Sequence, residues 1–223
     1  AVLDAKHLER NLYLLLQVAE IKKPLLVILN MMDEAEAAGK IIDTVDLSRK
    51  LGVPVIGSVA TSGKNLDQIA RFVLANDVPV PTLVVPYDHH IEAAVHSLQK
   101  YYGISQSEAL WALENVSVST ITPEIHENAL VIAEEIERRH MMSPEQIIAA
   151  NRHNLAKQLA ASVTSTAPPR RRRDFDALLT RGFPGLPILA LIMVSILLIV
   201  FTLGGILEET IVSLLTTYIS DPF

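Results

Sequence analysis

The chain has 223 residues, half of them hydrophobic, which is room for one or two domains. It has no cysteine, which excludes a disulfide framework and a thiolate metal site and fits a reducing compartment. Residues 1–167 hold 14 Lys and Arg against 20 Asp and Glu, and this acidic balance argues against nucleic acid as a partner.

Residues 1–77 have the pattern of an α/β domain with a parallel sheet. The end of a strand at residues 1–4 precedes an amphipathic helix that is capped by Asp4 and runs to about Ile21. The apolar run Leu25–Leu29 does not alternate, which predicts a strand buried on both faces. Strand–helix–strand order predicts parallel pairing. Further on, the pattern predicts short helices at 31–38 and 43–51, a strand at 53–58, and a helix capped by Asn65 that carries Leu66, Ile69 and Val73.

Asn30 and Asp33 follow the Leu25–Leu29 run, where ligands bind in open α/β sheets. A carboxylate there can accept from both the ring N1–H and the 2-amino group of guanine, while the asparagine braces neighbouring loops and the base edge. Adenine has no such donor pair and would leave the carboxylate unpaired. The alternative is structural, with Asn30 capping a helix and Asp33 favouring its dipole.

The loop Val59-Ala60-Thr61 follows the next strand. Small Ala60 lets the backbone approach a flat ligand, and its N–H could donate to a carbonyl oxygen. Taken alone, the loop is ordinary turn chemistry. Its position after a second strand, behind Asn30 and Asp33, favours a role in the same site.

Two runs, Leu-Glu-Arg-Asn-Leu-Tyr-Leu at 8–14 and Asn-Met-Met-Asp-Glu-Ala at 30–35, resemble the GTPase domain of ferrous iron transport protein B, a family of bacterial iron transporters. The resemblance implies a partial Ras-like domain whose guanine-specificity motif is Asn30-Met31-Met32-Asp33. It also implies that Val59, Ala60 and Thr61 form the second base-contacting loop. Many GTPases have Lys where this chain has Met31, and Ser-Ala where it has Val59-Ala60.

The sequence has neither a Gly-x-x-x-x-Gly-Lys-[Ser/Thr] phosphate loop nor an Asp-x-x-Gly switch motif. The chain also does not begin with Met, so we expect a fragment of a longer protein. We expect GTP or GDP as the ligand, and Mg²⁺ only in the intact protein, because the resemblance places its ligands in the missing half. No catalytic residue and no metal ligand is assigned. We expect the fragment to bind GTP weakly and to hydrolyse none.

Residues 86–163 have an all-helical pattern, with four capped starts at Asp88, Ser105, Thr122 and Ser143. They resemble the small helical domain that follows the GTPase domain in the same family, which implies a role in nucleotide release. His89, His90 and Glu92 are weighed as metal ligands. Adjacent histidines on a helix point to different faces, which favours a solvated first turn instead.

Residues 164–181 form a predicted basic linker with Arg170–Arg173, and residues 183–207 a predicted membrane helix. Sixteen Leu, Ile, Val, Phe or Met side chains between 186 and 207 favour insertion by roughly 5–10 kcal/mol. Gly204-Gly205 is expected to end this helix rather than to permit close helix approach. Residues 208–223 are expected to form an extracytoplasmic or interfacial segment, with Glu208 and Glu209 at the start of an amphipathic helix rather than as a cation-attracting pair. The arginines before the helix place the preceding domains in the cytoplasm.

The resemblance implies that the chain is part of a GTP-dependent Fe²⁺ uptake transporter that is multi-pass in the bacterial inner membrane. Its partners would be a guanine nucleotide, Fe²⁺ and the lipid bilayer, and the intact protein would be a GTPase. A homo-oligomer is left open. The alternative function is a membrane-tethered binding or adaptor module without transport activity.

Overall fold

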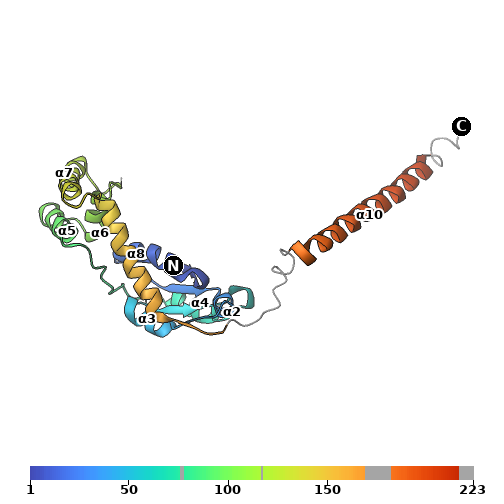
Figure 1. The fold of residues 1–223 in the computed structure, drawn as a ribbon, viewed down its shortest axis with the longest axis horizontal. Coiled ribbons are helices and arrows are strands. Elements are labelled where there is room, and N and C mark those ends of the chain that lie inside the picture. Colours follow the sequence, from blue (N-terminus) through green and yellow to red (C-terminus); the bar gives the residue numbers. More distant parts are fainter. Residues whose placement is uncertain (76–77, 117, 169–181, 216–223) are drawn as a thin grey trace. The chain divides into compact units, whose positions relative to one another are not determined.

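The computed structural model describes residues 1–75, 78–116, 118–168 and 182–215 (Figure 1). The chain divides into two compact units, Ala1–Arg170 and Arg171–Phe223, each considered by itself below. The arginine run at 170–173, which belongs to the predicted basic linker, lies outside the described residues. Residues 216–223, at the end of the predicted interfacial segment, also lie outside them.

A parallel three-stranded sheet forms the centre of the first unit. It contains β1 (Val2–Asp4), β2 (Val27–Asn30) and β4 (Val55–Gly57) in the order β1-β2-β4. The 3-10 turn η1 (Ala5–His7) and helix α1 (Leu8–Glu20) connect β1 to β2. The predicted parallel α/β class is confirmed. Asp4 caps η1 rather than α1, since its side chain accepts from the Lys6 N–H.

The loops after β2 and β4 lead into short helices. α2 (Met32–Ala37) follows β2, α3 (Thr44–Leu51) precedes β4, and η2 (Ala60–Ser62) and α4 (Leu66–Ala75) follow it. Asp43 caps α3 as its sequence position predicts, by accepting from two backbone N–H groups. Asn65 does not cap α4, because its backbone is left-handed and its amide donates to the Gly57 carbonyl at 2.7 Å.

A second, antiparallel sheet was not apparent in the sequence. It pairs β3 (Lys40–Ile42) with β5 (Thr164–Thr166), so β5 occupies the first three residues of the range predicted as a linker. Two strands of three residues carry too little periodicity to be recognised locally. They become strands because residues more than 120 positions apart meet in the tertiary structure.

Four helices follow: α5 (His89–Tyr102), α6 (Gln106–Leu113), α7 (Pro123–His140) and α8 (Pro144–Val163). All four predicted caps are present, with full capping boxes at Ser105 with Glu108 and at Ser143 with Gln146. α8 extends from α7 to the α/β region, where it packs against α1 and α3 (Figure 1). The boundary drawn between 1–77 and 86–163 stays a prediction.

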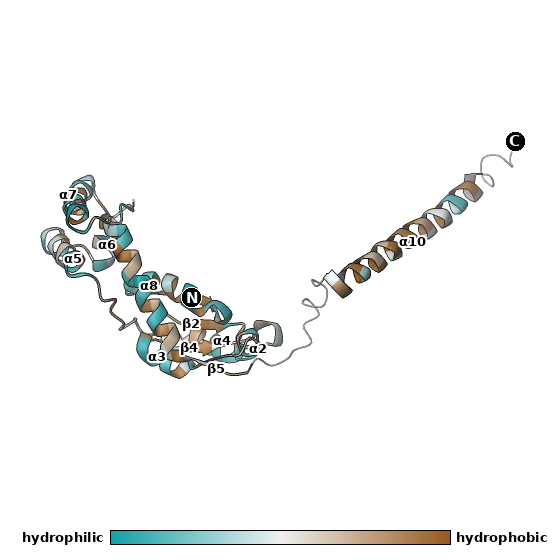
Figure 2. Cartoon of the chain, in the orientation of Figure 1, coloured by the Kyte–Doolittle hydropathy of each residue, from teal (hydrophilic) through white to brown (hydrophobic). Residues whose placement is uncertain are grey.

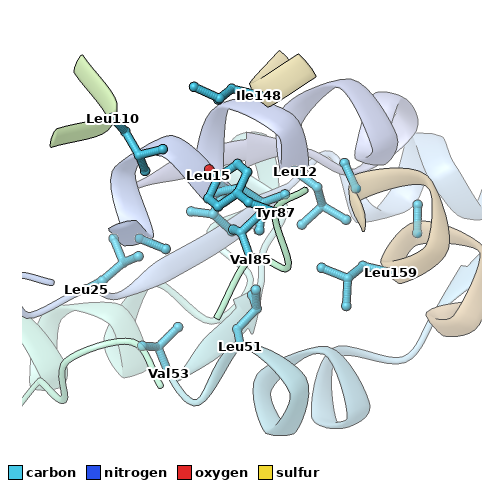
Figure 3. Packing of buried hydrophobic residues seen from close by; sticks show 14 of the residues in the cluster. Leu12, Leu15, Leu25, Leu51, Val53, Val85, Tyr87, Leu110, Ile148 and Leu159 are labelled. Atoms are coloured by element: carbon cyan, nitrogen blue, oxygen red, sulfur yellow. The ribbon is translucent and has the colours of Figure 1, made fainter. Parts of the chain in front are cut away.

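One apolar core runs through the first unit. It includes Leu12 and Leu15 of α1, Leu110 of α6 and Ile148 of α8, all of which are at most 1 % exposed (Figure 3). The predicted stripe of α1 is confirmed, since Leu8, Leu12, Leu15 and Ala19 are all buried.

The connector 78–88 is fastened to the α/β region. The Leu25 N–H donates to the Pro79 carbonyl at 3.0 Å, and Lys22 Nζ donates to the Leu83 carbonyl at 2.8 Å. Val85 and Tyr87 enter the core (Figure 3). The connector is therefore a packed part of the unit.

A charged cluster is buried where α1, the connector, α6 and α8 meet. Arg152 of α8 is only 2 % exposed. Its Nη2 lies 2.9 Å from Glu20 Oε2, its Nε donates to the Tyr87 hydroxyl at 3.0 Å, and its Nη1 donates to Glu114 Oε1 at 2.5 Å. The Tyr87 hydroxyl in turn donates to Glu20. We call these four residues the Arg152 cluster.

The second unit contains α10 (Gly182–Leu215), and Figure 2 shows that most of its residues are hydrophobic. Residues Gly182–Val212 are long and apolar enough to cross a membrane, and none of their most apolar stretch is buried. Two expectations were wrong. The helix continues through Gly204 and Gly205, and Glu208 and Glu209 lie on it rather than at the start of a separate helix. The residues on both sides of the two glycines are helical, so the glycines do not end the helix.

Candidate functional site

Asn30 joins the two loops that follow β2 and β4. Its Oδ1 accepts from the Ala60 backbone N–H at 3.1 Å and from the Ser58 hydroxyl at 3.3 Å. Met31, not Asn30, precedes the first residue of α2, and it has no capping side-chain bond. The structural alternative for Asn30, a helix cap, is therefore wrong, and the expected bracing of neighbouring loops is present.

Backbone contacts bring the same two loops together. The Ser58 N–H donates to the Leu29 carbonyl at 2.8 Å, and the Met32 N–H donates to the Ser58 carbonyl at 3.3 Å. A Cβ on Gly57 would lie 3.3 Å from Met32 Cγ, so the glycine permits close approach of the strand ends. The site is thus built on the ends of rigid strands.

Ser58 is a residue of this site that the sequence analysis did not select. It is 1 % exposed, and its hydroxyl donates to Asn30. The parallel register pairs Leu29 with Gly57, which places the next residues, Asn30 and Ser58, beside each other. Knowing that register would have identified Ser58.

The remaining predicted residues lie around this junction. Asp33 lies in the first turn of α2 and is partly buried, and Met31, in a left-handed backbone conformation, is 41 % exposed. Val59 is buried, whereas Ala60 and Thr61 are exposed. The Ala60 N–H, which we expected to donate to a ligand carbonyl, donates to Asn30 instead. The arrangement offers a partly buried carboxylate beside exposed, largely apolar loop surface, which suits a flat polar ligand.

The rings of His89 and His90 at the start of α5 lie close together, and His140 at the end of α7 lies beside them. Adjacent histidines were expected to point to different faces of the helix. The His89 and His90 ring centroids are 3.9 Å apart, and His140 of α7 lies 4.8 Å from His90. Burial, and then the neighbouring histidines and Arg139, lower the pKa of His90. Among the described residues no group of three His, Cys, Asp or Glu side chains has a geometry that could hold a metal ion.

Sequence comparison relates the chain to known transporters. A family model described as "Ferrous iron transport protein B" matches residues 1–73. The Fe(2+) transporter FeoB of Escherichia coli (strain K12) is 30% identical over 216 residues, which is 93% of this chain and 28% of that protein. The FeoB of Salmonella typhimurium is 28% identical over a similar stretch. Over 93% of its length the chain is thus similar to ferrous iron transport protein B.

Solved structures agree with this family. NFeoB from S. thermophilus bound to mGMPPNP has a TM-score of 0.63 and 26% identity, over 75% of this chain and 67% of that one. The partial GTPase-domain fold is thereby confirmed. The chain spans only 28% of the length of the curated FeoB relatives described above.

Proposed function

We propose that this chain recognises the guanine base of GTP and GDP through Asn30, Asp33 and the Val59–Thr61 loop. The bond from the Ala60 N–H to Asn30 carries the proposal, because it holds the two loops at a fixed separation. The Asp33 carboxylate then accepts from N1–H and the 2-amino group. Met31 and Met32 complete the motif, with the exposed Met31 side chain available to cover the base.

We further propose that the chain works within a GTP-dependent Fe²⁺ transporter of the bacterial inner membrane, with Fe²⁺ as the cargo. This rests on the similarity to the FeoB transporters and on the apolar helix α10. Residues 1–77 would supply guanine recognition, residues 86–163 would relay nucleotide state, and α10 would be the first span of a multi-pass protein. The soluble unit would lie in the cytoplasm.

GTP hydrolysis is proposed for the intact transporter and not for this chain alone. The sequence holds no phosphate-loop motif, so we expect weak nucleotide binding and no turnover. No Mg²⁺ ligand is assigned among the described residues, so Mg²⁺ binding by the intact protein stays a prediction.

Asp33→Asn tests base recognition. The amide would donate where the carboxylate accepts, so it should favour xanthine, whose 2-oxo group replaces the amino group. We expect the ratio of GDP to XDP affinity to fall on the order of 100-fold. The measurement is a fluorescence titration of the full chain, in neutral-detergent micelles, with labelled GDP, XDP and ADP.

Glu36→Gln is the matched control, since it removes an exposed carboxylate from the same helix. It should leave the GDP preference unchanged. An Asp33→Asn chain that still prefers GDP to XDP, or a native chain that binds ADP as well as GDP, would overturn the proposed recognition.

A further inference from the structure

A groove of about 530 Å³ lies between the start of α1 and the C-terminal half of α8. Its floor is apolar and is formed in part by the buried residues Ala5, Leu8 and Ala160. This groove has no part in the base site described above, since none of the predicted base-site residues lines it.

The rim of the groove is strongly basic. Its lining includes the four cations Lys6, Arg10, Lys40 and Lys157, two histidines, and a single carboxylate, Glu9. Residues 1–167 carry 14 Lys and Arg against 20 Asp and Glu, so four of 14 cations gather in one groove of an acidic unit. The local field therefore opposes the net charge of the unit and attracts anions.

Two of these cations are available to an external ligand. Lys40 Nζ donates to the Lys6 carbonyl at 2.7 Å, and Lys6 Nζ lies 3.5 Å from Glu34. By contrast, the exposed side chains of Arg10 and Lys157 have no hydrogen-bond or ion-pair partner anywhere in the described parts of the chain. Arg10 extends from α1 and Lys157 from α8, on opposite walls.

The chemistry of the groove suits a phosphate group that carries an apolar tail. A guanidinium binds phosphate oxygens through paired hydrogen bonds, and an ammonium binds them as a point charge. An apolar floor beneath a cationic rim is the arrangement that amphipathic anions require. A free phosphate would use only the rim.

The groove and the apolar helix α10 belong to the same chain. Thr164 lines the groove, and α10, which is long enough to span a membrane, begins at Gly182. Eighteen residue steps extend to at most about 60 Å, so the covalent chain limits the separation from the bilayer. A lipid headgroup is therefore present at high effective concentration.

We propose that the groove binds the phosphodiester headgroup of an anionic membrane lipid, with Arg10 and Lys157 contacting the phosphate from opposite walls. His7 and His153, which also line the groove, report on its occupancy. His153 stacks on Tyr13 with ring centroids 4.7 Å apart, so its ring environment is fixed in the absence of lipid.

The test is a titration of the full chain, in neutral-detergent micelles, with short-chain phosphatidylglycerol. Imidazole NMR signals of His7 and His153 are followed, after assignment by single His→Gln substitutions. We expect saturable shifts in the native chain and affinity weaker by on the order of tenfold in the Arg10→Gln/Lys157→Gln chain. The control Lys100→Gln/Arg138→Gln removes the same two charges from exposed positions outside the groove and should retain native affinity.

Two further ligands identify the source of the phosphate. Phosphatidylcholine of the same chain length should bind much more weakly, because its choline cancels the phosphate charge. Inorganic phosphate should not saturate the shifts at matched concentration. Equal binding of either ligand, no saturable shift with phosphatidylglycerol, or equal losses in both double variants would overturn the proposal.

Discussion

Glu20 and Glu114 share the single guanidinium of Arg152, and burial is the main influence on the protonation of Glu20. Burial raises the pKa of Glu20 despite hydrogen bonds from Tyr87 and attraction to Arg152. The charge of Glu114 raises it further. A buried arginine between two carboxylates leaves one excess negative charge, so the more buried carboxylate holds its proton more tightly.

Glu20→Gln tests this balance. A carboxyl whose folded pKa is raised contributes stability below its unfolded pKa, near 4.5, and loses it as the pH rises through the folded value. We therefore expect the variant to gain stability relative to the native chain as the pH rises above 4.5. Urea unfolding followed by the fluorescence of Trp111, the single tryptophan, measures this difference. A difference that stays constant with pH would contradict the assignment.

At the scale of elements, the junction of α3 with the connector depends on one glycine. Gly52 ends α3 with a φ of +71°, and a Cβ there would lie 1.8 Å from Thr82 Oγ1. Gly103 ends α5 with a similar φ of +65° but has no atom within 4 Å of its would-be Cβ. Both positions require a left-handed backbone, and they differ only in whether other atoms lie near the added Cβ.

Gly52→Ala and Gly103→Ala form a matched pair for this reason. Each should lose about 1–2 kcal/mol because alanine is strained in the left-handed region. Gly52→Ala should lose about 1–3 kcal/mol more, since the connector must shift away from α3. Unfolding free energies from urea titration give both values. Equal losses would mean that the connector is not held against α3.

At the scale of the whole first unit, the Arg152 cluster joins the α/β region to the helices. It links α1, the connector, α6 and α8 through side chains that are nearly all buried. α8 is held at two places, at this cluster and through the β5 strand that follows it. The contacts of Arg152 therefore connect α8 directly to α1 and to the end of α6.

Arg152→Met should destabilise the unit by about 3–5 kcal/mol, because it leaves two buried carboxylates without their cation. Adding Glu20→Gln and Glu114→Gln should restore most of this loss, since no unpaired charge then remains. The stabilities of the single and triple variants are compared by thermal unfolding, which is monitored by the fluorescence of Trp111. A triple variant as unstable as the single one would show that packing of Arg152, not its charge, is what matters.

Local sequence was enough for much of this structure. The caps at Asp88, Ser105, Thr122 and Ser143 were predictable because each is a contact within three residues. The α10 segment was predictable because its apolar length is a property of composition. Asn30 and Asp33 were selected because they follow a predicted strand and lie in a run that resembles the family's guanine motif, whereas their spacing alone left a helix cap open.

Contacts between distant segments were decided by tertiary structure alone. The β3–β5 pair, the Asn30–Ser58 bond and the Arg152 cluster each join residues 28 to 132 positions apart, so no local pattern marks them. The sequence also predicts apolar residues along α4, yet no α4 residue is buried in the described structure. A sequence determines which surfaces are apolar or charged, through periodicity and composition. Only the packed chain determines which of them meet, because pairing depends on register and geometry between remote elements.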